Sequence, residues 1–147
     1  MIPVPLKVQR ERGAALLETA LTMPLIILVA VGIFEFGRAY QTWQVLTNAA
    51  REGARVAVLP TSTSEHVTTR ATQYMTFGHL PRAEEATVAL DAETIDLGGG
   101  LTAGASRVTV NYPFEFMVLQ PIANLVTGGT DLGAPFTMTA TAVMRNE

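Results

Sequence analysis

The chain has 147 residues, no cysteine and a formal net charge of −3. This length leaves room for one domain and an anchor, and the absence of cysteine excludes a disulfide framework, a thiolate metal site and a thiol nucleophile. Residues 1–13 carry a net charge of +2, so the remainder carries −5. The acidic remainder argues against nucleic acid as a partner.

Residues 1–13 contain Pro3 and Pro5 and show no apolar period, so we interpret them as a processing segment without structure of its own. An apolar run follows over residues 14–34. As a helix, this run would extend about 31 Å, close to the thickness of the hydrocarbon core of a bilayer. Because the positive charge precedes the run, we expect the N-terminus in the cytoplasm and the rest of the chain outside.

Two other interpretations begin from the same basic flank and apolar run. A secretory signal needs an apolar core of about 7–15 residues that ends at a small-residue cleavage site, whereas this run is longer and continues into more helix. An uncleaved signal anchor requires only the flank and the run, so this alternative stays open. In either case Glu18 needs an explanation, because a carboxylate near the bilayer centre costs on the order of 3 kcal/mol and favours a cationic partner.

The helical pattern continues to Leu59 and ends before Pro60. Residues at spacings of three and four predict one face of an amphipathic helix, namely Trp43, Leu46, Ala50, Gly53 and Ala57. The first half of the helix is therefore apolar on all sides and the second half is amphipathic. We assign residues 14–35 to the transmembrane half, and residues 36–147 to the amphipathic half plus a small extracytoplasmic domain.

Charged residues of this helix are candidates for contacts in an assembly. Glu35 and Arg38 are three residues apart and can pair on one helix face. This pair either marks where the helix leaves the lipid, among aromatic residues typical of that boundary, or contacts a neighbouring helix. Glu52 can pair with Arg55 at the same spacing. The candidates for a helix interface are Glu35, Arg38, Arg51, Glu52 and Arg55.

A short second helix is predicted beyond the polar connection that follows Pro60. Ser64 is its N-cap candidate, Gly78 its C-cap candidate, and Pro81 stops it.

The remaining sequence changes to a period of two. Strands are predicted over residues 87–90, 106–114 and 136–144, with a glycine-rich turn between the first two. Pro113 should lie at an edge or a bend. Residues 116–133 are ambiguous between a short apolar helix and a loop. The sequence therefore predicts an α+β fold, with a long N-terminal helix on a three- or four-stranded antiparallel sheet.

The sequence contains few residue patterns typical of metal-binding or catalytic sites. Neither His66 nor His79 has an acidic residue at a ligand-like spacing, so we expect no metal site. Asp91, Glu93 and Asp96 could meet calcium in a loop, but the glycine and the bidentate glutamate of a calcium loop are missing. The serines lack a nucleophile elbow and a paired histidine. We therefore expect no catalytic residue, no cofactor and no small-molecule substrate, so that the protein is not an enzyme.

Three segments carry a resemblance to a known family. They are residues 12–18 (RGAALLE), 32–38 (GIFEFGR) and 48–55 (NAAREGAR). The first of them, followed by a long apolar helix, resembles the signature of type IV pilins and pseudopilins. Together they resemble the TadE-like family of the tight-adherence (Tad) pilus machinery, and residues 142–145 resemble the end of that family. Thr19 stands where Tad-system pilins often have tyrosine, which favours a minor pilin or pseudopilin over the major pilin.

The resemblance implies a pilin-like fold and a role in pilus biogenesis or adhesion. A prepilin peptidase would cut after Gly13 and leave Ala14 as the new N-terminus. Glu18 would then meet the N-terminal amine of a neighbouring subunit during assembly. Without such a partner, Glu18 would reach the lipid headgroups or carry a proton.

The implied partners are the bacterial inner membrane, the prepilin peptidase, other pilins or pseudopilins and the Tad assembly platform proteins. The protein would be a single-pass membrane protein that enters the pilus on assembly. The alternative is an anchored extracytoplasmic binding module that no prepilin peptidase processes.

Overall fold

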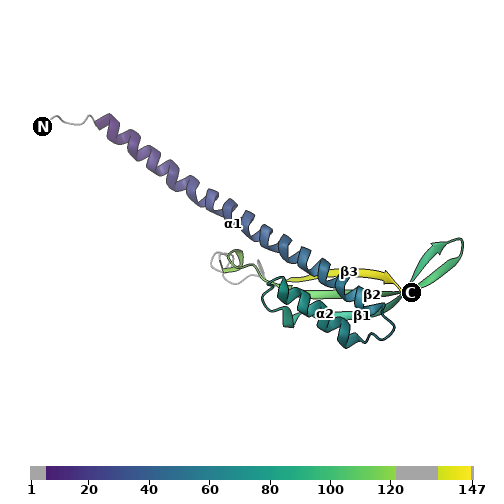
Figure 1. The fold of residues 1–147 in the computed structure, drawn as a ribbon. Coiled ribbons are helices and arrows are strands. Elements are labelled where there is room, and N and C mark those ends of the chain that lie inside the picture. The colour runs from purple at the N-terminus through teal and green to yellow at the C-terminus, as the bar shows by residue number, and fades with distance from the viewer. Residues whose placement is uncertain (1–5, 122–135, 147) are drawn as a thin grey trace.

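The computed structural model describes residues 6–121 and 136–146, with side chains described from residue 13 onward, and Figure 1 shows the arrangement. Helix α1 spans Leu6–Ala57, α2 spans Ser64–Phe77, and the 3-10 helix η1 spans Ala83–Glu85. The strands are β1 (Thr87–Gly98), β2 (Leu101–Phe114) and β3 (Phe136–Arg145). They form an antiparallel sheet in the order β1-β2-β3. The predicted α+β fold, a long helix packed on a small antiparallel sheet, is confirmed.

Helix α1 begins at Leu6, so residues 6–13 are helical and the expectation that residues 1–13 have no structure is wrong for this part. Pro5 is the last proline before the helix, and the next one is Pro24. Residues 6–23 therefore keep every backbone donor that a helix needs. At its other end α1 stops at Ala57, two residues before the expected Leu59.

The first half of α1 projects away from the rest of the protein (Figure 1). Apart from the half-buried Val31, its large apolar side chains between Leu16 and Phe34 are 51–72% exposed. Within the described residues, α1 is the one helix long and apolar enough to cross a membrane. At this exposure these side chains are not part of the core formed by the described residues.

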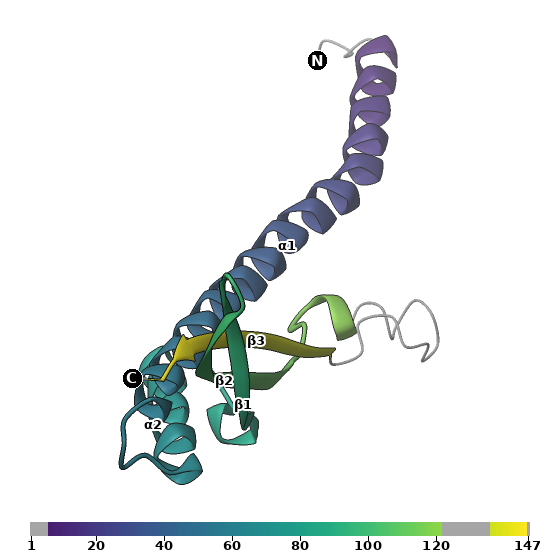
Figure 2. The ribbon, with the colours of Figure 1, turned by 90° about the vertical axis from the view of Figure 1, so that its right-hand side faces the viewer.

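The threonine hydroxyls in this projecting half are satisfied by the helix itself. The hydroxyl of Thr19 donates to the carbonyl of Ala15 (2.9 Å), and that of Thr22 donates to the carbonyl of Glu18 (3.0 Å). Pro24 has no N–H for the carbonyl four residues earlier, which weakens the helix there. Figure 2 shows α1 bending within this half.

The second half of α1 packs on the sheet. It lies against β2 and β3, while α2 lies beside it and contacts β1. Leu46, Ala49 and Ala50 are fully buried. A Cβ atom at Gly53 would lie 3.1 Å from Cγ1 of Val108, so the small residues here let helix and sheet approach closely.

The packed face of α1 differs from the predicted one at its start. Trp43 was expected on this face, but its side chain is 48% exposed, whereas Thr42 is 7% exposed. At 100° per residue, position 42 lies nearer than position 43 to the direction of Leu46 and Ala49.

Strands β1 and β2 are longer than predicted, and their outer ends form a hairpin that extends beyond the helices (Figure 1). Gly98, Gly99 and Gly100 have φ angles of 86°, 64° and 82°, which favour glycine in this turn. Pro113 lies in the central strand, but pairing with β1 ends at Asn111 and Pro113 pairs only with Thr137. The proline thus lies where β2 has become an edge.

The ends of α2 differ in detail from the prediction. The N-cap is Thr63, whose hydroxyl accepts from the N–H of His66 (3.4 Å). Gly78 is the C-cap with φ −74°, so the glycine is not needed for a left-handed conformation. It is needed for space, because a Cβ there would lie 2.6 Å from Cγ1 of Val45. Of the ambiguous residues 116–133, residues 119–121 are helical and residues 122–133 lie outside the described residues.

We expect Leu46→Ala to destabilise the globular part by about 2–5 kcal/mol, because it removes a fully buried side chain between helix and sheet. Thermal unfolding of the full chain in detergent, followed by near-ultraviolet circular dichroism, measures this effect. Leu101→Ala is the matched control, since Leu101 is 69% exposed. Equal losses in the two variants would contradict the packing described above.

Candidate assembly sites on the long helix

Gly13 and Ala14, the predicted processing site, lie within α1 and are exposed. No described atom lies within 4 Å of where a Cβ at Gly13 would be, so packing within the chain does not require glycine here. Glycine in a helix costs about 1 kcal/mol relative to alanine. A requirement from outside the chain is therefore the better explanation for Gly13, and recognition by a peptidase is one such requirement.

Glu18 lies one helical turn beyond Ala14 on the exposed, apolar half of α1. Among the side chains that the structure describes, no cation pairs with it. Its place on an otherwise apolar surface means that any partner must come from outside the described residues.

Glu35 lies at the end of the apolar half and is completely buried. Its Oε1 accepts a hydrogen bond from the backbone N–H of Val118, 83 residues away, at 2.5 Å. Its Oε2 lies 3.9 Å from Nη1 of Arg38, without a hydrogen bond of its own. The carboxylate therefore holds the chain that follows β2 against α1, a contact that sequence spacing could not indicate.

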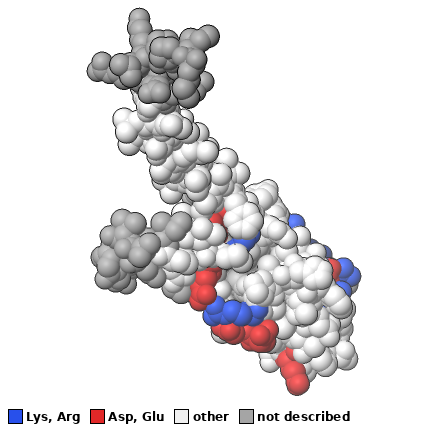
Figure 3. Space-filling model, turned by 90° about the vertical axis from the view of Figure 1, so that its left-hand side faces the viewer, with Lys and Arg blue, Asp and Glu red and all other residues white. Residues whose placement is uncertain are grey.

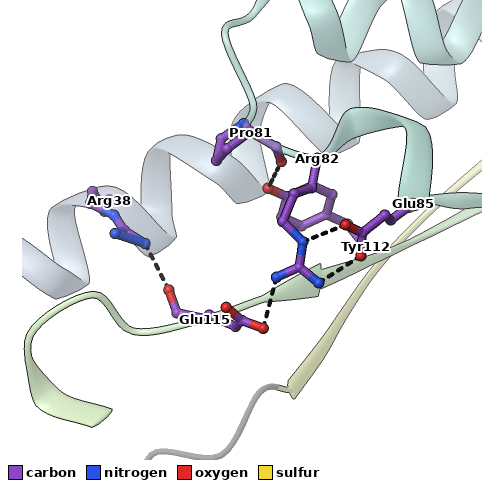
Figure 4. A network of polar contacts seen from close by, with 6 residues as sticks. All are labelled: Arg38, Pro81, Arg82, Glu85, Tyr112 and Glu115. Carbon is purple, nitrogen blue, oxygen red and sulfur yellow. Dashed lines mark hydrogen bonds and ion pairs between the residues drawn. The ribbon is translucent and has the colours of Figure 1, made fainter. Parts of the chain in front are cut away.

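Arg38 connects the helix to the end of β2. Its Nη2 donates to the backbone carbonyl of Glu115 (2.8 Å), as Figure 4 shows. Its guanidinium lies 5.2 Å from the centre of the Phe114 ring. The arginine thus contributes a hydrogen bond and a cation–π contact in addition to its charge near Glu35.

Arg82 continues this network beside η1, as Figure 4 shows. It pairs with the carboxylates of Glu85 (2.6 Å) and Glu115 (2.7 Å) and has a left-handed backbone, with φ 58°. Its hydrogen bond lowers the pKa of Glu85. The hydroxyl of Tyr112 donates to the carbonyl of Pro81, and burial raises the pKa of Tyr112. Sequence analysis missed this cluster, although the spacing of Arg82 and Glu85 was a local signal.

The remaining interface candidates lie near the packed end of α1. Glu52 pairs with Arg55 (3.1 Å) and also with Arg70 of α2 (3.4 Å), while Arg51 and Arg55 are exposed. Glu52 thus links the two helices of its own chain. A role of these residues toward another subunit stays a prediction.

A groove of about 580 Å³ lies beside the network of Arg38 and Arg82, between α1 and the end of β2. Its walls combine Gln41, His79 and Tyr112 with apolar residues. Within the described parts of the chain, no three His, Asp or Glu side chains are grouped so that they could hold a metal ion.

Comparison with known families identifies one segment near the N-terminus. Residues 13–55 match the model of the TadE-like protein family. The resemblance seen in the sequence is therefore confirmed over this stretch, which lies entirely within α1 and includes both of its halves. The chain therefore contains a TadE-like segment, and its apolar N-terminal helix could anchor it in a membrane. No curated protein and no solved structure gives a significant match.

We expect Glu35→Ala to speed hydrogen exchange at the amide of Val118 by about tenfold or more, because this N–H loses its acceptor. Exchange measured by NMR on the full chain in detergent provides the test. Glu35→Gln is the matched control, since its amide oxygen can still accept the bond. Protection at Val118 that is equal in both variants would show that Glu35 does not hold this segment.

Proposed function

We propose that this protein, which contains a TadE-like segment, is a minor pilin or pseudopilin of a Tad-type pilus, processed after Gly13 and contributing to pilus biogenesis or adhesion. The observation that supports this most strongly is the division of α1. Its first half exposes large apolar side chains on all sides, and its second half packs on a small sheet of the same chain. The family match covers both halves.

The proposed mechanism is assembly through the apolar half. Cleavage after Gly13 would leave an amine on Ala14 at the cytoplasmic end of the span. In a filament, the carboxylate of Glu18 would meet that amine on a neighbouring subunit. A buried charge gains most from a buried partner of opposite sign, and removal of one partner costs about 3–5 kcal/mol because the other charge is left unpaired. This pairing would set the register between subunits.

The proposed membrane topology and partners follow from the same helix α1. The protein would span the inner membrane once, with its N-terminus in the cytoplasm and the sheet outside, as the basic leader favours. Its partners would be the prepilin peptidase, other pilins or pseudopilins and the assembly platform. It would act by assembly, with no catalytic activity and no cofactor.

We expect the protein isolated from membranes of its own host to begin at Ala14 and to lack residues 1–13. Intact mass and N-terminal sequencing measure this directly. Replacement of Gly13 by leucine should leave the full-length chain, whereas Thr22→Ala, nine residues further along, should be processed normally. A full-length wild-type chain in cells with an active prepilin peptidase would favour the anchored binding module instead.

We expect Glu18→Ala to be inserted and cleaved normally but to be depleted from pili by tenfold or more, on the order of what an unpaired buried charge predicts. Quantitative immunoblots of sheared filaments and membranes measure the ratio. Thr19→Ala is the matched control, because Thr19 lies beside Glu18 and its hydroxyl donates to the carbonyl of Ala15 in its own helix. Normal incorporation of Glu18→Ala would disprove the pairing with the amine.

A further inference from the structure

A short uncharged segment follows β2 and lies outside the sheet. Residues 116–121 read FMVLQP, and none of them is ionisable. Met117 is 64% exposed, and Phe116, Val118 and Leu119 are half-buried. An exposed methionine among apolar neighbours forms an apolar patch, and removing this patch from water by contact with an apolar partner is favourable.

The hydrogen bond to Glu35 fixes the level of this segment along α1. Val118 is tied to Glu35, which directly follows Phe34, the last residue of the apolar run. Because residues 14–34 extend about 31 Å, a span that begins at Ala14 ends near the outer boundary of the hydrocarbon core. Residues 116–121 therefore lie at that boundary.

Exposed aromatic side chains of α1 lie at the same level or just beyond it. Phe36 is 68% exposed, Tyr40 61% and Trp43 48%. Tyrosine and tryptophan favour the boundary between lipid and water, where the ring is in an apolar layer and the polar atom is in a wet one. Figure 3 shows that on its face the charged side chains gather over the globular part, and the white, described part of the projecting helix above the junction shows none on this face.

We propose that residues 116–121 dock on the outer leaflet of the bilayer, with Met117 inserted at the boundary between headgroups and acyl chains. Together with the aromatic side chains of α1, this segment holds the globular domain against the membrane before assembly. The complete burial of Glu35 fits this position, because the segment covers a carboxylate that would otherwise face lipid. The inference rests on the proposed membrane span of α1.

Because the chain has no cysteine, single-cysteine variants can be labelled at one position each. Met117→Cys probes the docking segment. Leu101→Cys at the tip of the β1–β2 hairpin is the matched control, since Leu101 is also apolar and 69% exposed. Ile26→Cys reports on the span. Each full-length variant carries an environment-sensitive fluorophore and is placed, one chain per disc, in nanodiscs of phosphatidylethanolamine and phosphatidylglycerol.

Lipids with a spin label near the headgroup should quench the label at position 117 at least about threefold more than the label at position 101. Equal quenching at 117 and 101, with position 26 quenched by deeply spin-labelled lipid, would overturn the docking and leave the span intact. An unquenched label at position 26 would overturn the span, and both proposals with it. Shielding of position 117 only in discs with several chains would show that a second copy covers it and would also overturn lipid docking.

Discussion

The close contact between the alanine-rich half of α1 and the central strand is the constraint on which the other features depend. Ala49, Ala50 and Gly53 present almost no side chain, so the backbone of the helix lies close to Val108 on β2. Once this half of the helix is packed on the sheet, the other half must project, because the sheet is too short to cover it. The exposed apolar surface of α1 is thus a consequence of where the domain is attached.

Two carboxylates of α1 then differ in their surroundings although both lie near an end of the apolar run. Glu35 is completely buried, and the N–H of Val118 bonded to its Oε1 offsets part of the cost of burying the carboxylate. Glu18 is exposed and has no cationic partner among the described side chains. This contrast is why Glu35 is described as holding the domain on the helix, and why we propose that Glu18 contacts another molecule.

The sequence predicted the features that depend on local spacing. The apolar run, the amphipathic face and the three strands follow from periods that neighbouring residues reveal, although Trp43 was assigned to the wrong side of the helix by one position. The contacts of Val118 with Glu35 and of Arg82 with Glu115 join segments far apart in the chain, and no spacing indicates them. The prediction missed the helical start at Leu6. Pro3 and Pro5 disfavour a helix only near their own positions, whereas the prediction applied them to all of residues 1–13. The interface roles of Arg51 and Arg55 depend on a second subunit, which no property of one chain can supply.

Some glycines of the described residues are required by packing within the chain, and others are not. Gly53 and Gly78 stand where a side chain would press on Val108 or Val45. Gly13, Gly32 and Gly37 lie in the same helix as Gly53, yet no described atom would meet a Cβ at any of them. Each costs the helix about 1 kcal/mol relative to alanine and gains no close contact in return within the described residues. At Gly13 the proposed peptidase provides a reason. At Gly32, which lies in the apolar half, a neighbouring helix in the proposed assembly would provide one, because small residues let helix backbones approach each other in a membrane.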